Sequence, residues 1–153
     1  MNEGNSADEI HLFTIGFAGK RAQEFFELLQ IAGVRRVLDV RLNNSSQLAA
    51  FTKQRDLEYF LRVIAAIAYE HVEQLAPTKE ILDGYKQEKL TWEEYEREFN
   101  LLLAARRPES SLPPEQLDRA CLLCSEPTAD HCHRRLVAEY LQRRLGGIVV
   151  EHL

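Results

Sequence analysis

The residue types best suited to chemistry gather in one short segment near the end of the chain. Cys132 lies where a helical pattern begins, and the helix dipole and nearby cations favour the thiolate form of a cysteine at such a position. Glu126 can exchange a proton with a ligand, and His133 can orient the neighbouring thiol. We therefore predict Glu126, Cys132 and His133 as catalytic residues. Cys124 and Arg134, in the same segment, are predicted to bind the ligand.

Two other interpretations of this segment stay open. One is a zinc site, because the segment holds suitable ligand atoms in Cys124, Cys132, His133 and either His131 or Glu126. No CxxC or HxxxH pair accompanies these residues in the usual arrangement, so we predict no metal ligands and leave the cofactor unassigned. The other is that the cysteines are small buried core residues, which is the favoured interpretation for Cys121.

Two further clusters lie earlier in the chain. Asp39 and Arg41 are two residues apart at the end of an apolar strand, and therefore on one face. They form either a structural ion pair or, through Arg41, a fork for a phosphate or carboxylate. Gly16 and Lys20 flank a turn from a strand into a helix, where free N–H groups favour an anion, although the turn also has a purely structural interpretation.

The apolar residues predict the elements that must position these clusters. Strand-like segments occupy residues 11–15, 34–41, 69–75, 120–125 and 148–153. Between them, apolar residues recur with helical spacing, as at Phe25, Phe26 and Leu29. Thr91 and Glu94 form the pattern of a capping box at the start of one helix, and Trp92 and Tyr95 fall on its apolar face and are assigned to the core. Asp130 is expected to cap the last helix.

Strands separated by helices favour parallel pairing through right-handed crossovers. We predict a Rossmann-like three-layer α/β/α sandwich with a mostly parallel sheet of about five strands. Residues 11–153 are expected to form a single domain after a flexible leader, residues 1–10. The strand order does not follow from the pattern.

The predicted fold places the clusters on one edge of the sheet. Ligands of open parallel sheets bind outside the carboxyl ends of the strands. The turn after the first strand, the pair after the second, Lys79 after the third and the cysteine segment after the fourth all follow strand ends. We therefore predict one site at this rim, with Lys79 among its ligand-binding residues.

The composition narrows the class of protein. The 153 residues carry a formal charge of −5, which argues against a broad basic face that coats a nucleic acid duplex. No apolar run approaches the roughly 18–20 residues of a membrane span, and the polar N-terminus resembles no signal peptide. Three cysteines cannot all pair with one another, so a disulfide framework is not expected. We expect a cytoplasmic protein without a membrane partner and leave its oligomeric state open.

The motifs, in this order, resemble those of an uncharacterised bacterial and archaeal family, domain-of-unknown-function family 488 (DUF488). They are TIGFAGK at 14–20, DVR at 39–41, AFTK at 50–53, YEH at 69–71, PTKE at 77–80, CLLCSE at 121–126, CHR at 132–134 and VEHL at 150–153. The resemblance spans about residues 12–153 and adds Lys53 to the predicted ligand-binding residues. This chain departs from the family pattern at Ala18, where a glutamate is common, and at Ser125, where an aromatic residue is common. It also lacks the usual proline and basic residues in the loop after DVR.

Several cations facing two carboxylates predict a phosphate-bearing ligand at the rim. We expect an enzyme that acts on a nucleotide or on a fragment derived from nucleic acid, a substrate class towards which the resemblance also points. Glu126 would serve as acid or base, Cys132 as nucleophile or polariser, and Arg41 and Arg134 as anion clamps. The alternatives are a non-catalytic module that binds a nucleotide or anion, and a structural domain supported by zinc.

Overall fold

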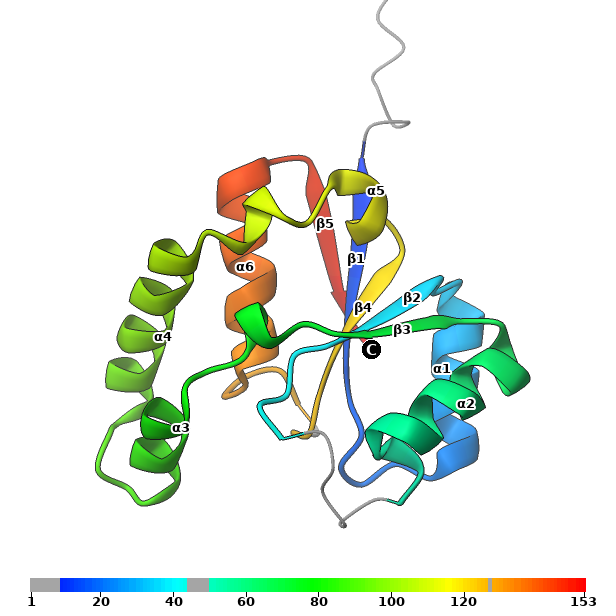
Figure 1. Ribbon diagram of the computed structural model, residues 1–153, viewed down its shortest axis with the longest axis horizontal. Coiled ribbons are helices and arrows are strands. Elements are labelled where there is room, and N and C mark those ends of the chain that lie inside the picture. The colour runs from blue at the N-terminus through cyan, green and yellow to red at the C-terminus, as the bar shows by residue number, and fades with distance from the viewer. Residues whose placement is uncertain (1–8, 44–49, 127) are drawn as a thin grey trace, which may run out of the picture.

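The computed structural model describes residues 9–43, 50–126 and 128–153, and its five strands form one parallel sheet (Figure 1). The strands are β1 (Ile10–Gly16), β2 (Arg36–Asp39), β3 (Ala68–His71), β4 (Ala120–Cys124) and β5 (Ile148–His152). Their order in the sheet is β3-β2-β4-β1-β5. The prediction of a Rossmann-like α/β/α fold with a five-stranded parallel sheet is confirmed.

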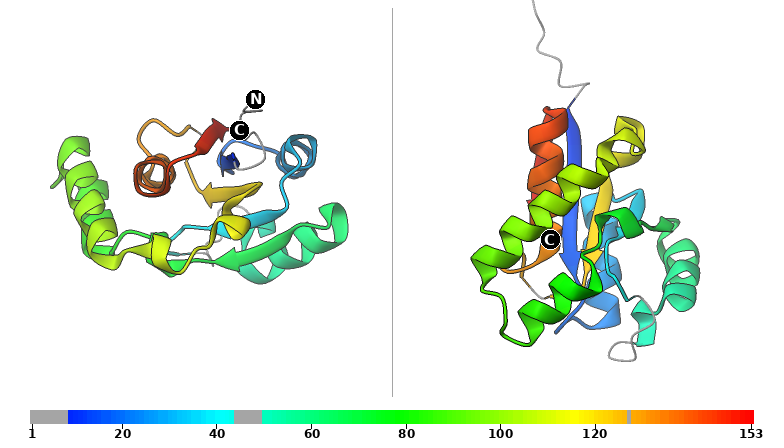
Figure 2. Two further views of the ribbon diagram at one scale, coloured as in Figure 1. Left: turned by 90° about the horizontal axis from the view of Figure 1, so that it is seen from above. Right: turned by 60° about the vertical axis from the view of Figure 1, so that its left-hand side comes forward.

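Helices cover both faces of the sheet (Figure 2). On one face lie α1 (Ala22–Ala32) and α2 (Gln54–Ala65), and on the other lie α4 (Trp92–Arg106) and α6 (His133–Leu145). Two shorter helices, α3 (Lys79–Lys86) and α5 (Pro114–Leu117), belong to the connections. Three single turns of 3-10 helix complete the elements: η2 (Ala50–Thr52), η3 (Glu73–Leu75) and η4 (Pro108–Ser110). No helix in the described parts of the chain is long and apolar enough to cross a membrane.

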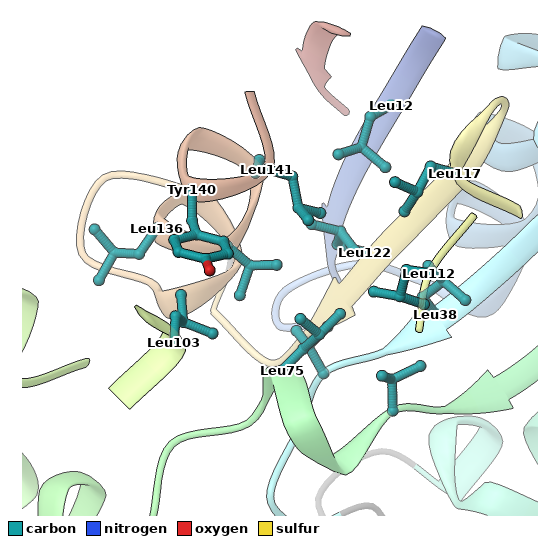
Figure 3. Close-up of a cluster of buried hydrophobic side chains, with 14 of the residues drawn as sticks. Leu12, Leu38, Leu75, Leu103, Leu112, Leu117, Leu122, Leu136, Tyr140 and Leu141 are labelled. Carbon is teal, nitrogen blue, oxygen red and sulfur yellow. The ribbon is translucent and has the colours of Figure 1, made fainter. Parts of the chain in front are cut away.

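Alternation along the strands divides the core into two. Leu38 and Leu122 face the layer formed by α4 and α6, in the cluster of leucines shown in Figure 3. Val37 and Cys121, one residue earlier on each strand, face α1 and α2. Because the side chains of a strand point alternately to opposite faces, each strand contributes to both layers of core. Cys121 and Cys124 accordingly lie in different clusters, on opposite faces of the sheet, as alternation predicts.

The boundaries of several elements differ from those predicted. The strand predicted at 34–41 is β2, which ends at Asp39, so Arg41 lies beyond the ladder. The strand predicted at 69–75 is split into β3 and η3, because the amide of Leu75 closes a turn on the carbonyl of Val72 at 3.0 Å. The last helix begins at His133 with Cys132 as its N-cap, later than an Asp130 cap implies. The capping box of Thr91 and Glu94 is present as predicted.

The start of the chain also differs slightly from the prediction. Ile10 is already the first residue of β1, so the predicted leader ends earlier than residue 10. The rest of the leader, residues 1–8, lies outside the described residues, as do residues 44–49 of the loop after the DVR motif.

Candidate functional site

The strand register brings the carboxyl ends of the central strands to one edge of the sheet. Gly16 of β1 is in register with Cys124 of β4, and Asp39 of β2 is in register with Leu123. The segment before α6 starts from the same edge, and α3 lies at this end of the molecule (Figure 1). This edge is the rim on which the sequence places its chemistry.

A cleft of about 700 Å³ opens at this rim. Its walls come from the segment after β2, from α3 and the start of α4, and from the segment between β4 and α6. The predicted site residues that line it are Arg41, Cys124, Glu126, Cys132 and His133. The predicted site residues outside its lining are Gly16, Lys20, Asp39, Lys53, Lys79 and Arg134.

Asp39 and Arg41 form a buried ion pair. The arginine donates from Nε to Oδ1 at 2.8 Å and from Nη2 to Oδ2 at 2.7 Å, and its main-chain amide also donates to Oδ1. Tyr69 donates its hydroxyl proton to Oδ2 of the same carboxylate at 2.5 Å. Such a two-pronged, charge-assisted pair is geometrically specific. The structural interpretation of Asp39 therefore holds, and Asp39 serves to hold Arg41.

One guanidinium nitrogen of Arg41, Nη1, takes no part in the pair with Asp39. Nη2 also donates to the carbonyl of Thr52 at 2.7 Å, and the guanidinium lies 5.4 Å from the ring centre of Phe17. Nη1 is buried, and it has no hydrogen-bond partner among the residues the structure describes. A buried donor without a partner typically costs about 1–3 kcal/mol, so native proteins rarely keep one without a reason. Because Arg41 lines the cleft, a ligand oxygen is a natural partner for this N–H.

His133 is held beside the same strand end. Its Nε2 lies 2.6 Å from the carbonyl oxygen of Val40, which can only accept, so Nε2 carries the proton. The edge of its ring contacts Phe99, with ring centres 5.8 Å apart. Burial lowers the pKa of His133 to about 4; the charge of Arg134 lowers the pKa further, while the Val40 hydrogen bond and the charge of Asp39 raise it. The ring is therefore neutral at pH 7, and Nδ1 is an acceptor.

Gly16 and Lys20 support the loop that carries Glu126. A side-chain carbon at Gly16 would overlap the main-chain carbonyl of Glu126 and press on Arg134, so only glycine fits there. The amide of Ala18 donates to the carbonyl of Ser125 at 2.9 Å, and Nζ of Lys20 donates to the carbonyl of Gly16 at 2.7 Å. Burial and the charge of Arg134 lower the pKa of Lys20. Glu126 thus has a fixed main chain and an exposed side chain at the cleft.

Arg134 lies behind the cleft and is 1% exposed. Nε donates to the hydroxyl of Thr14 at 3.2 Å, and Nη1 donates to the main-chain carbonyl of Glu126 at 2.6 Å. Nη1 also contacts two sulfur atoms, Sγ of Cys124 at 3.2 Å and Sγ of Cys132 at 3.8 Å. The structure thus places Arg134 against the sulfur atoms and the loop.

The way the cysteines combine does not follow from the sequence pattern. Cys124 and Cys132 form a disulfide pair, with Cα atoms 7.7 Å apart. This separation is longer than the roughly 4.4–6.8 Å of most disulfides, so the closed bond requires a small movement of the backbone, whereas two neighbouring thiols do not. Cys121 is a free thiol, fully buried on the opposite face of the sheet, and burial raises its pKa. No group of three metal-ligating side chains occurs in the described ranges, which leaves the zinc interpretation without a ligand set.

The remaining predicted cations lie elsewhere. Lys53 is the N-cap of α2, on the face of the sheet opposite α4 and α6. Lys79 is the exposed first residue of α3 and does not reach the cleft lining. Two lysines that were not predicted, Lys86 and Lys89, line the cleft instead, at the end of α3 and in the turn that follows.

Aromatic rings form a second unpredicted part of the site. Trp92 stacks with Tyr95, with ring centres 5.1 Å apart, and with His131, with ring centres 4.8 Å apart, and Tyr85 meets it edge-on. All four side chains line the cleft. Trp92 and Tyr95 do pack with the core as predicted, but they also face the site. The aromatic content of residues 85–95 was a visible signal, but its meaning depends on how α3 folds back onto α4.

The comparisons with known proteins identify the family of the chain. No curated protein and no solved structure matches it. Residues 21–141 match the family model described as Domain of unknown function DUF488. The matched region runs from just before α1 to near the end of α6 and contains every predicted site residue except Gly16 and Lys20. The chain therefore belongs to the DUF488 family.

Proposed function

We propose that the cleft binds a phosphate-bearing small molecule of the nucleotide class and that the protein acts on it as an enzyme. The observation that carries the proposal is Nη1 of Arg41, which is buried and has no partner within the described ranges. Asp39 neutralises and orients this guanidinium, which leaves one nitrogen in fixed geometry for an anionic oxygen.

The charge of the cleft supports an anionic ligand. Lys86 and Lys89 join Arg41 in the lining, opposed by Glu88 and Glu126. The buried cation of Arg134 lies directly behind the sulfur atoms of the wall. Because the two lysines are balanced by the two glutamates, and Arg41 by Asp39, Arg134 supplies the excess positive charge that favours an anion at the back of the cleft.

The size and the rings of the cleft support a nucleotide within that class. Its volume, about 700 Å³, falls within the roughly 300–1,000 Å³ of small-molecule sites. His131 is exposed and already stacked on Trp92, so its outer face is available to a flat ring. Stacking on such a ring tolerates any base and contributes about 1–3 kcal/mol per base.

The catalytic roles follow from the positions of three side chains. In the reduced protein, Cys132 lies at the N-terminus of α6 beside Arg134, which favours its thiolate as a nucleophile. The exposed carboxylate of Glu126 is free to exchange protons with solvent and ligand. His133 offers Nδ1 as an acceptor because Nε2 is committed to Val40.

Ligand titration tests the proposal. Calorimetry with a panel of nucleoside mono- and diphosphates should give binding to the reduced wild-type protein. Arg41→Lys keeps a positive charge beside Asp39 but removes Nη1, and should weaken binding at least about tenfold. Lys79→Ala, at the exposed first residue of α3 and outside the cleft lining, is the matched control and should leave the affinity within about twofold. Circular dichroism and thermal unfolding check that each variant is folded.

A second measurement separates an enzyme from a binding module. The reduced wild-type protein is incubated with the nucleotides that it binds, and the products are followed by mass spectrometry. Cys132→Ser should abolish conversion and keep the affinity. Binding without conversion by the wild-type protein would instead identify a non-catalytic nucleotide-binding module. The absence of binding by any phosphate compound, or unchanged binding by Arg41→Lys, would contradict the proposal.

A further inference from the structure

The two sulfur atoms at the back of the cleft come from different elements. Cys124 is the last residue of β4, and Cys132 is the N-cap of α6. Both are almost completely buried, yet both line the cleft. Their sulfur atoms are paired, so the pair forms part of the wall that a small molecule in the cleft would meet.

Arg134 forms no ion pair with a carboxylate of the described residues, and the exposed Glu126 acts on it only through a longer-range charge interaction. Its contacts are a hydroxyl, a main-chain carbonyl and the two sulfur atoms, and no ion pair within 4.0 Å involves it in these parts of the chain. Arg41, the other buried arginine, is instead neutralised by Asp39. A buried charge without a partner costs several kcal/mol. The sulfur atoms are the groups in contact with Arg134 that are able to carry a negative charge.

We propose that Cys124 and Cys132 are a redox-active pair, a dithiol that shares one negative charge beside Arg134 when reduced and closes to a disulfide when a peroxide oxidises it. Two observations carry this inference independently: the adjacency of the sulfur atoms and the guanidinium that touches both of them without a carboxylate of its own in the described ranges. Electropositive surroundings of this kind favour the thiolate, the form that reacts with peroxides.

The oxidation proceeds in two balanced steps. The Cys132 thiolate attacks one oxygen of hydrogen peroxide, the O–O bond breaks, and the departing hydroxide takes a proton to become water. Cys132 is then a sulfenic acid, and the peroxide has been reduced by two electrons. The Cys124 thiol attacks that sulfur, the S–S bond forms, the S–O bond breaks, and a second water leaves with the thiol proton. A dithiol such as dithiothreitol reverses the change by thiol–disulfide exchange.

The pair also has a consequence for the cleft, and this consequence alone rests on the proposed function. Closing the disulfide consumes the Cys132 nucleophile. Nucleotide conversion should therefore stop on oxidation and return on reduction. The redox chemistry itself needs no nucleotide, so a thiol measurement can succeed or fail independently of the proposed function.

Cys121 provides an internal control for the test. The reduced protein, freed of dithiothreitol, is treated with one equivalent of hydrogen peroxide, alkylated and mapped by mass spectrometry. Cys124 and Cys132 should lose their alkylation together and appear as one linked peptide pair that lacks two hydrogens. Cys121, buried on the other face, should stay a thiol that is alkylated only after denaturation. Treatment with dithiothreitol should restore both alkylation sites.

Variants test the two parts of the inference. In Cys124→Ser, peroxide should leave a sulfenic acid on Cys132, which dimedone traps. Arg134→Lys should slow the oxidation at least about tenfold, because the shorter lysine does not bring its charge to the place of Nη1, which contacts both sulfur atoms. Arg143→Gln, exposed in the last turn of the same helix, is the matched control and should keep the wild-type rate.

Four results would overturn the inference, the fourth being a lack of dimedone labelling. One is a wild-type protein in which Cys124 and Cys132 react with peroxide no faster than Cys121. Another is oxidation that yields no Cys124–Cys132 link. The third is a folded Arg134→Lys variant, verified by near-ultraviolet circular dichroism, that oxidises at the wild-type rate. Because Cys124→Ser keeps Arg134, its dimedone labelling tests the reactivity of Cys132 even if the Arg134 variant does not fold, and a lack of labelling would contradict the inference.

Discussion

Single residues at the rim owe their properties to the partners that they meet. Asp39 and Arg41 neutralise each other's charge, whereas the described contacts of Arg134 are with neutral acceptors and sulfur. His133 is neutral because burial opposes its charge, and the hydrogen bond to the carbonyl of Val40 fixes the remaining proton on Nε2. The same residue types at an exposed rim would be ordinary solvated charges, so burial is what gives them a chemical role.

The pKa of His133 makes a prediction about stability and pH. The pKa of His133 in the folded protein is about 4, below the ordinary histidine value of 6.5. Between these two pH values the unfolded chain binds a proton at His133 and the folded protein does not. Above pH 6.5 the His133 ring is neutral in both the folded and the unfolded state, so its stabilising contribution is fully present. As the pH falls from 6.5 towards 4, the unfolded chain takes up the proton first, and the free energy of unfolding decreases by up to about 3 kcal/mol. Urea unfolding at several pH values measures this loss.

His133→Gln is the control for this titration. The glutamine amide keeps a donor for the carbonyl of Val40 but cannot titrate. Its free energy of unfolding should fall less than that of the wild-type protein between pH 6.5 and 4. Parallel curves for the two proteins would show that His133 is not the group responsible.

At the scale of elements, the site depends on how loops cross the strand ends. The segment after β4 lies directly on Gly16 at the end of β1. The main-chain amides of Phe17 and Ala18 donate hydrogen bonds that connect the two segments. The α3–α4 pair forms the opposite wall of the cleft. The rim is therefore a joint product of elements that are distant in the sequence.

Gly16→Ala should disrupt this arrangement. The new methyl group overlaps a main-chain carbonyl, so the loss of stability should reach the upper end of the roughly 1–3 kcal/mol typical of overpacking. Gly19→Ala is the matched control: its φ is +76°, but no described atom lies within 4 Å of the added carbon, so only the backbone cost of about 1 kcal/mol applies. Chemical unfolding measures both variants. Equal losses would contradict the close approach at Gly16.

At the scale of the whole molecule, the sheet separates two cores and β4 lies in the middle of it. All five residues of β4 are buried, while β3 and β5 form the edges and are partly exposed. A buried central strand with helices on both faces is typical of parallel sheets. The central strand therefore carries both the packing and, at its carboxyl end, one of the paired cysteines.

Leu122→Ala should consequently be far more destabilising than Val149→Ala. Leu122 of β4 is fully buried against the α4–α6 layer, so its truncation should lower the free energy of unfolding by about 2–5 kcal/mol. Val149 is 42% exposed on the edge strand, and its truncation should cost less than about 1 kcal/mol. Thermal and urea unfolding compare the two. Similar losses would mean that stability is not concentrated in the central strand.

The fold class and the part of the site that lies on strand ends could be predicted from the sequence. Hydrophobic periodicity is local, and the rule that ligands bind beyond the carboxyl ends of parallel strands converts it into a prediction of place. Arg41, Cys124, Glu126, Cys132 and His133, which line the cleft, were identified in this way.

The tertiary structure alone decided which of these groups meet. The pairing of Cys124 with Cys132, the contact of Arg134 with both sulfur atoms, and the orientation of Arg41 by Asp39 all depend on ångström-scale contacts. Lys86 and Trp92 reach the cleft because α3 folds back along α4, a geometry that no local pattern encodes. Side-chain type and spacing are written in the sequence, but burial and partnership arise from packing, and these give the rim its chemistry.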